Sequence, residues 1–160
     1  MTGVARAARA CDHRAMSETP RLPDGYEFSG DTARVDVGLV HGWLSTDAYW
    51  AMDRPRETHE QAMASSLNFG VYETGSGAQV AYARVVTDRA LFAWLADVYV
   101  DRSVRGKGVG TAFVAGIRDH LRPYGVRRIL LATEDAHGLY EKLGFRPLDR
   151  PEMWMIHTPG

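Results

Sequence analysis

A glycine-rich turn between an apolar run and a helical pattern limits the folds open to this chain more than any other feature. Residues 91–96 form an apolar run that, with the aromatic and β-branched residues at 98–100, is typical of a buried strand ending near Val100. Residues 105–110 then read Arg-Gly-Lys-Gly-Val-Gly, and apolar residues recur at helical spacing from Val109 to Leu121. The sequence therefore predicts a strand, a glycine turn and a helix in succession.

The three alternate glycines suit a phosphate-binding turn. Glycine has no Cβ atom, so its backbone adopts positive φ angles and an anion can approach several N–H groups at once. Those groups would lie at the positive end of the following helix, beside the cationic side chains of Arg105 and Lys107. We therefore expect this turn to hold a phosphate or pyrophosphate. The alternative is a strand-to-helix turn without a ligand.

Two common nucleotide-binding motifs do not fit the spacing. A P-loop needs a lysine followed by Ser or Thr after its second glycine, but Lys107 precedes Gly108 and no Ser or Thr follows it. A Rossmann fingerprint needs a third glycine at the position that Thr111 occupies. Both interpretations are therefore rejected.

Two segments instead resemble motifs of the GCN5-related N-acetyltransferases. The pattern Val-x-x-x-x-Arg-Gly-x-Gly-x-Gly from Val100 to Gly110 is similar to the acetyl-CoA loop of that family. Residues 136–145 are similar to its Ala-x-x-Leu-Tyr-x-Lys-x-Gly-Phe segment, and the two occur in the family's order. The resemblance implies an α+β fold with a central mixed, mostly antiparallel sheet of six to seven strands, a splayed parallel pair and about four flanking helices.

The resemblance also implies acetyl-CoA as acyl donor, with separate residues for its pantetheine arm and its pyrophosphate. The pantetheine arm would pair with the backbone of Val98, Tyr99 and Val100, and the Val98 N–H could polarise the thioester carbonyl. The pyrophosphate contacts fall mostly on backbone N–H groups of the turn and the start of the helix: Arg105, Gly106, Lys107, Gly108, Val109, Gly110 and Thr111.

Three residues are candidates for the chemistry of acetyl transfer. Tyr140 matches the family's tyrosine that protonates the leaving thiolate, and a phenol with a resting pKa near ~10 is protonated at neutral pH. Asp97 is the candidate general base, although it could equally satisfy backbone donors where the strands splay. His137 precedes Tyr140 by three residues on the same helix face, where it could relay a proton or simply face solvent.

The acceptor site is expected in the region before the central strands. Tyr49, Trp50, Arg54 and Arg56 lie in the segment that would form one wall of this site. Arginines among aromatic residues suit an acceptor that bears a carboxylate, such as an amino acid or a peptide end. An aromatic core with solvated arginines explains the same residues nearly as well.

Composition excludes several other classes of protein. With 19 basic and 20 acidic residues, the chain gives no support for a nucleic-acid or membrane partner. Its single cysteine, Cys11, forms no disulfide framework and no cysteine metal site, which fits a cytoplasmic protein without a metal. We expect a disordered extension over residues 1–20, with Met16 as an alternative start, and a single acetyltransferase domain over residues 21–160.

The remaining elements follow from turn residues and hydrophobic pattern. A helix returning the chain beside the central strand makes residues 128–133 its parallel neighbour. The last two strands could pair across a homodimer. We expect strands within 26–36, 69–73, 79–86, 91–100, 128–133, 145–148 and 153–157, and helices at 38–44, 57–67, 109–121 and 137–143.

These patterns favour an N-acetyltransferase in which a primary amine of a small molecule or peptide attacks acetyl-CoA directly. One alternative is an acyl-CoA-binding module without turnover, serving as a sensor or partner subunit. Another is transfer to a protein lysine or N-terminus, which the residues alone do not separate from the first.

Overall fold

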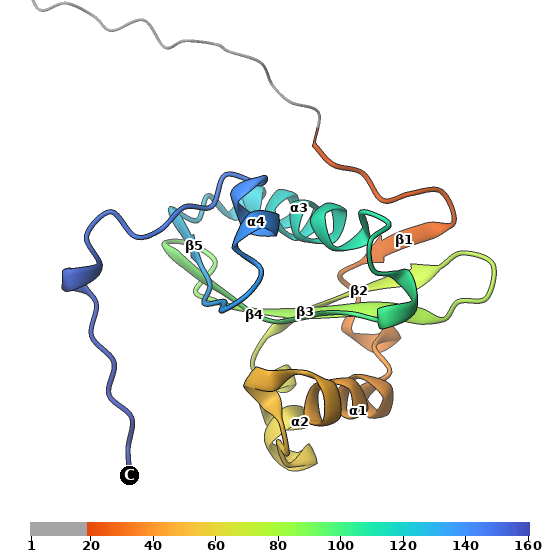
Figure 1. The fold of residues 1–160 in the computed structure, drawn as a ribbon, viewed down its shortest axis with the longest axis horizontal. Coiled ribbons are helices and arrows are strands. Elements are labelled where there is room, and N and C mark those ends of the chain that lie inside the picture. The colour runs from red at the N-terminus through yellow and green to blue at the C-terminus, as the bar shows by residue number, and fades with distance from the viewer. Residues whose placement is uncertain (1–18) are drawn as a thin grey trace, which may run out of the picture.

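The computed structural model describes residues 19–160, so the expected N-terminal extension lies almost wholly outside the described residues. These residues form one five-stranded sheet with helices on both faces (Figure 1). The strands are β1 Tyr26–Ser29, β2 Leu67–Glu73, β3 Gln79–Thr87, β4 Phe92–Val100 and β5 Arg128–Leu130. The α-helices are α1 Val37–Asp47, α2 Arg56–Ala64, α3 Val109–Leu121 and α4 His137–Glu141. Short 3-10 turns are η1 Thr32–Arg34, η2 Tyr49–Ala51, η3 Arg102–Val104, η4 Arg122–Tyr124 and η5 Pro151–Met153.

The sheet follows chain order, β1-β2-β3-β4-β5, and is antiparallel except between β4 and β5. The parallel pair is short, because only Phe92 to Trp94 of β4 pair with β5. The second half of β4 therefore has a neighbour on its β3 side alone. This is the splayed parallel pair that the sequence predicts.

Two hydrophobic clusters hold helices to the two faces of the sheet. One face packs against α3 and α4, with Phe113, Ile117 and Leu121 of α3 fully buried. The other face packs against α1 and α2, where Val40 and Leu44 cover aromatic residues of β3 and β4. Figure 1 shows α3 and α4 on one side of the sheet and α1 and α2 on the other. Helices from both layers therefore extend to the loops at the end of β4.

A β-bulge distorts β4 at its centre. Tyr82 pairs with Tyr99 while Arg84 pairs with Ala96, so one β3 residue opposes two residues of β4. Asp97 lies in the bulge with a φ angle of +53°, a left-handed conformation that is uncommon for a residue with a side chain. The bulge turns the Asp97 side chain into the layer of α1 and α2 and is a strained point of the fold.

The predicted fold class is confirmed, but the predicted number of strands is wrong for the described residues. Residues 145–148 and 153–157 form no strand, so five strands replace the expected six to seven. Pro147 and Pro151 have no N–H to donate to a ladder, and η5 bends the chain between the two segments. Met155 and Ile156 are 98% and 92% exposed, and Figure 1 shows this end of the chain standing away from the sheet.

Several element bounds also differ from expectation. The segment expected to carry a helix over 57–67 ends its helix at Ala64, because β2 already begins at Leu67. The strand expected over 128–133 stops at Leu130, and the region of the first strand is split into β1 and η1. Among the described residues, no helix has the length and hydropathy to span a membrane.

Candidate active site

The glycine turn connects η3 to α3 at the end of β4. Gly106 and Gly108 have φ angles of +76° and +81°, and Gly108 is the N-cap residue of α3. A Cβ atom at either position would meet no other atom within 4 Å, so glycine is needed for the backbone angle and not for space. Within residues 19–160 no side chain caps α3, and the first N–H groups of a helix have no intrahelical acceptor. The turn therefore offers free N–H groups to an anion.

The third glycine of the turn, Gly110, is required for space and not for its backbone angle. A Cβ atom on Gly110 would lie 3.3 Å from Cδ1 of Leu139 and 3.5 Å from Cγ2 of Val100. Gly110 thus allows α3 to approach both β4 and α4 closely. The neighbouring Val109 is 1% exposed and belongs to the core, while Thr111 is half-buried. Val109 can therefore offer a ligand of the turn only its backbone.

The two cationic residues of the turn differ in their contacts. Nε of Arg105 donates to the Val100 carbonyl at 2.8 Å, and its guanidinium lies over the Tyr99 ring, 5.3 Å from the centroid. Asp47, at the end of α1, accepts hydrogen bonds from Arg105, Arg102 and the Tyr99 hydroxyl. Arg102 and then Tyr99 lower the pKa of Asp47 to about 2. Lys107, by contrast, is exposed at the tip of the turn.

The open side of β4 presents backbone groups next to this turn. The Asp101 N–H donates to the Val80 carbonyl of β3 at 2.8 Å. Backbone groups alternate in direction along a regular antiparallel strand, so Val100 turns its groups away from β3, whereas Val98 lies in the bulge, where this alternation is interrupted. No strand pairs with that side beyond Trp94. Tyr99, between them, is buried against Trp43, with ring centroids 5.2 Å apart.

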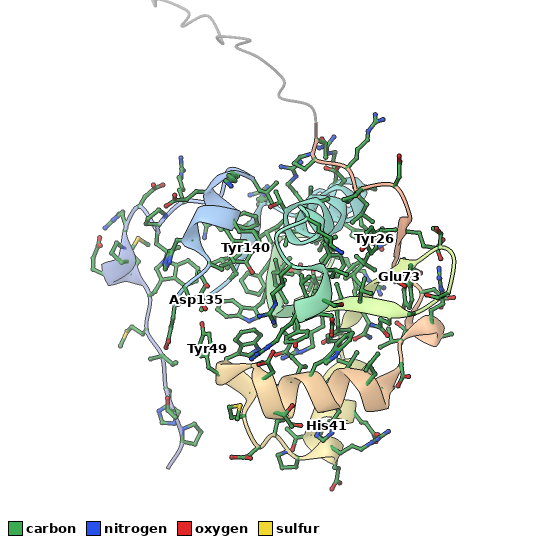
Figure 2. All side chains as sticks on the ribbon, turned by 45° about the vertical axis from the view of Figure 1, so that its right-hand side comes forward. Tyr26, His41, Tyr49, Glu73, Asp135 and Tyr140 are labelled. Carbon is green, nitrogen blue, oxygen red and sulfur yellow. The ribbon has the colours of Figure 1, made fainter. Side chains whose placement is uncertain are left out.

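Tyr140 lies in α4, belongs to the hydrophobic cluster on the α3 face of the sheet and is 8% exposed. Burial, with smaller contributions from Tyr49 and Asp135, raises the pKa of Tyr140 to about 12. The Tyr49 hydroxyl accepts the Glu134 N–H at 3.0 Å, which ties η2 to the loop after β5. Figure 2 shows Tyr49 and Tyr140 on the same side of the molecule, with Asp135 between their labels. A protonated phenol is therefore held near a wall of the expected acceptor site.

His137 does not share the position of Tyr140. It is the first residue of α4 and is exposed, whereas Tyr140 is buried against the ring of Phe145. The expected placement on one helix face therefore does not make His137 part of the same buried site.

Asp97 is enclosed by donors from three segments. Oδ2 of Asp97 accepts from Nη1 of Arg54 at 2.7 Å and from Nε of Arg84 at 2.6 Å. Oδ1 accepts from Nη2 of Arg54 at 3.0 Å and from the indole N–H of Trp50 at 3.1 Å. Arg54 thus forms a bidentate pair with the carboxylate. We call these four residues the Asp97 cluster.

The electrostatics of the Asp97 cluster disfavour a proton acceptor. Burial alone would raise the pKa of Asp97, but hydrogen bonds from Arg54 and Arg84 outweigh it and hold the pKa below its ordinary value. A carboxylate stabilised in this way accepts a proton poorly near neutral pH. Asp97 therefore has the contacts of a positioning residue, although its donors are the side chains of Trp50, Arg54 and Arg84 and not the backbone donors expected from the sequence.

The expected acceptor residues divide into two groups. Trp50 and Arg54 belong to the Asp97 cluster, and Tyr49 packs edge-on against Trp50 with ring centroids 5.0 Å apart. Arg56 lies apart from them, in an exposed pair with Glu60 one turn along α2. Arg84 was missed by sequence reasoning. Its signal is a charged residue inside the otherwise apolar run of β3.

A buried histidine lies beside the Asp97 cluster. His59 of α2 is 0% exposed, and neither of its ring nitrogens has a hydrogen-bond partner among residues 19–160. Its ring lies 5.7 Å from that of His41 and 6.1 Å from that of Tyr82, between centroids. Burial lowers the pKa of His59, so the imidazole is neutral in the folded protein at neutral pH.

Comparison with known proteins gives consistent matches over most of the chain. Residues 39–145 match the model of the acetyltransferase (GNAT) family. A putative acetyltransferase of Gibberella zeae is 30% identical over 135 residues, 73% of this chain and 76% of the relative. A pig thialysine N-epsilon-acetyltransferase is 24% identical over 146 residues, 88% of this chain and 78% of that protein. The crystal structure of a putative GNAT acetyltransferase from Xanthomonas campestris has a TM-score of 0.78 and 41% identity, covering 84% of this chain and 93% of that one.

Proposed function

Because this chain belongs to the acetyltransferase (GNAT) family, we propose that it transfers the acetyl group of acetyl-CoA to a primary amine of a small molecule or peptide. The observation that carries this proposal is the uncapped start of α3 at the end of a splayed strand. The family uses acetyl-CoA, so the proposal concerns how this chain binds it and which amine receives the acetyl group.

The turn and the open edge of β4 suit the two ends of the donor. Free N–H groups from Gly106 to Thr111 would hold the pyrophosphate, with Lys107 as a nearby cation. Val98 and Val100 would pair with the amide groups of the pantetheine arm, because this half of β4 has no strand partner opposite β3 among the described residues. The Val100 carbonyl accepts a hydrogen bond from Arg105. Arg105 would have to release this acceptor before the pantetheine arm could pair fully with Val100.

Tyr140 would act as the general acid. In the proposed step the amine nitrogen bonds to the thioester carbon, the C–S bond breaks, and the thiolate takes the phenolic proton. Solvent then reprotonates the phenolate. The raised pKa of Tyr140, about 12, keeps the proton on the phenol until a strong base such as a thiolate forms beside it. The Val98 N–H would stabilise the negative charge on the carbonyl oxygen.

The proton of the attacking amine would not go to Asp97, although a general base is one of the two roles that the sequence leaves open for this residue. Asp97 is held in ion pairs with Arg54 and Arg84, so we assign it to positioning. An acceptor bound as an ammonium would lose one proton to water before it attacks. After the attack the nitrogen would release a second proton to solvent as the tetrahedral intermediate collapses to the amide, which balances the proton that the phenolate regains. This assignment predicts a rate that rises with pH until the acceptor amine itself is deprotonated.

The one carboxylate of the Asp97 cluster is paired with Arg54 and Arg84. An acyl-CoA-binding module without turnover would show the same arrangement. The two proposals differ in one result. A module binds acetyl-CoA and releases no CoA when amines are added, whereas an enzyme releases free thiol.

The experiment is calorimetric titration with acetyl-CoA, followed by a thiol-release assay against pooled amines, amino acids and peptides. The enzyme proposal expects binding and acceptor-dependent release that Tyr140→Phe suppresses. Binding without release from any pool supports the module, and absence of binding contradicts both.

A further inference from the structure

The Asp97 cluster contains more positive than negative charge. Two guanidiniums, of Arg54 and Arg84, share the single carboxylate of Asp97, which leaves a formal charge of one positive unit. The side chains of Arg54, Arg84 and Asp97 are 18%, 16% and 2% exposed. An ion group that is largely removed from water is costly unless its charge is balanced.

No other group of the described residues balances this charge. Arg54 and Arg84 form no ion pair except with Asp97 within residues 19–160. The titratable neighbours that face the cluster from α2 and α1 are His59 and His41, and His59 is neutral because burial lowers its pKa. Tyr82 of β3 also faces Asp97, and its hydroxyl donates to Asn68 at 2.7 Å, so it brings no negative charge.

The cluster keeps donors for an additional anion. Nε of Arg84 is used by Asp97 and Nη1 contacts the Ser66 hydroxyl at 3.3 Å, while Nη2 has no partner among the described residues. Both guanidiniums retain some exposure, as stated above. Guanidinium groups bind planar carboxylates with two parallel hydrogen bonds, which an ammonium group does not offer.

The cluster also adjoins the proposed reaction centre. Asp97 directly precedes Val98, which lies in the half of β4 that pairs only with β3 among the described residues. Trp50 donates to Asp97 and packs against Tyr49, which contributes to the raised pKa of Tyr140. A ligand held at the arginines therefore lies between the acceptor wall and the strand that would hold the thioester.

We propose that Arg54 and Arg84 form a carboxylate subsite, and that the acceptor is an amine bearing a carboxylate, as in an amino acid. This rests on the proposed acetyl transfer and names the class of its acceptor. Asp97 positions both guanidiniums and reduces their repulsion. An acceptor whose charges are all positive is disfavoured, because its second ammonium would face the unbalanced arginine charge.

The test compares acceptors that differ only in the carboxylate. Lysine is paired with cadaverine and 4-aminobutyrate with butylamine, and lysinamide keeps the size of lysine without its negative charge. We expect kcat/KM to be about tenfold or more higher for the carboxylated member, with the difference mainly in KM, because the carboxylate adds binding energy.

Substitutions at Arg54 and Arg84 test whether these residues cause the preference for carboxylated acceptors. Arg84→Gln and Arg54→Gln should abolish the difference between the members of a pair, and Arg84→Lys should restore part of it. Arg122→Gln, in an exposed pair with Asp119, is the matched control and should keep it. Acetyl-CoA affinity, measured by calorimetry, identifies variants that still fold.

The outcomes separate this inference from the function on which it rests. Equal kcat/KM within each pair, or a carboxylate preference that survives both glutamine variants with acetyl-CoA binding intact, overturns the subsite alone. Binding of acetyl-CoA without thiol release from any acceptor overturns the acetyl transfer, and the subsite with it.

Discussion

The proposed acetyl-CoA site, called here the donor side, and the proposed amine site, called the acceptor side, are built in different ways. The donor side is one continuous stretch, from β4 through the glycine turn to the first turn of α3. The acceptor side gathers Trp50, Arg54, Arg84 and Asp97 from four separate segments. The first is specified by backbone conformation within one continuous segment of the sequence. The second exists only when the sheet and the α1–α2 layer pack together.

The two sides also differ in how far their charged groups are exposed to water. At the donor side Asp47 takes hydrogen bonds from two exposed arginines and Tyr99, where water screens the charges. At the acceptor side Asp97 is 6% exposed and its partners are largely buried. Removal of a charge should therefore be tolerated on the donor side and costly on the acceptor side. The following predictions test this difference, starting with the largest effect.

Gly108→Val should abolish donor binding while leaving the acceptor side intact. Valine is strained at a φ angle of +81°, so the start of α3 must reorganise and its N–H groups lose their common direction. We expect acetyl-CoA affinity to fall by about a hundredfold or more, measured by calorimetry. Gly75→Val is the control, since its added atoms meet nothing and its φ is not in the left-handed region. Unchanged affinity in Gly108→Val contradicts the assignment of the turn.

Asp97→Asn should destabilise the fold far more than Asp47→Asn. Neutralising Asp97 leaves two largely buried guanidiniums without a counter-charge, which typically costs about 3 kcal/mol of unfolding free energy. Urea denaturation of both variants measures the difference. Similar losses in the two variants would show that the acceptor side is no more dependent on its charge balance than the donor side.

Tyr140→Phe should lower kcat by about a hundredfold and leave acetyl-CoA affinity unchanged, since only the acidic proton is lost. Phenylalanine keeps the packing against Phe145, whose ring centroid lies 5.7 Å from that of Tyr140. Steady-state kinetics and calorimetry separate the two quantities, with the exposed Tyr124→Phe as control. An unchanged kcat removes Tyr140 from the mechanism.

His59→Phe should make the unfolding free energy less dependent on pH. The pKa of His59 is lowered in the folded protein, so the unfolded chain binds more protons below about pH 6.5 and stability falls on acidification. One such group contributes a slope of at most about 1.4 kcal/mol per pH unit. Denaturation of both proteins between pH 5 and 8 measures this slope. Parallel curves for wild type and His59→Phe would show that His59 is not the group that titrates.

The sequence was informative where structure is local. The apolar run of β4, the helical spacing of α3 and the turns around β2 and β3 predict those elements, and the structure confirms them. The glycine motif predicts the turn and its positive φ angles. It does not separate Gly108, which needs its backbone angle, from Gly110, which needs space beside Leu139.

The sequence was less informative where distant segments meet. Arg54 and Arg56 are two residues apart and look alike, yet one reaches Asp97 and the other pairs with Glu60. Arg84 joins the same carboxylate across the β3–β4 pair, and the bulge at Asp97 has no local signal. The last strands were predicted from apolar residues alone, and Pro147 and Pro151 outweighed that pattern.

The short β5 leaves one edge of the sheet open, and this has a consequence for behaviour in solution. Arg127 and Arg128 are exposed at that edge. The apolar side chains of Trp154, Met155 and Ile156 in the last segment are exposed as well. Like charges on an edge oppose its pairing with the edge of another molecule. Salt shortens the range of this repulsion to about 10 Å at 0.1 M. We therefore expect self-association of this protein to increase with ionic strength.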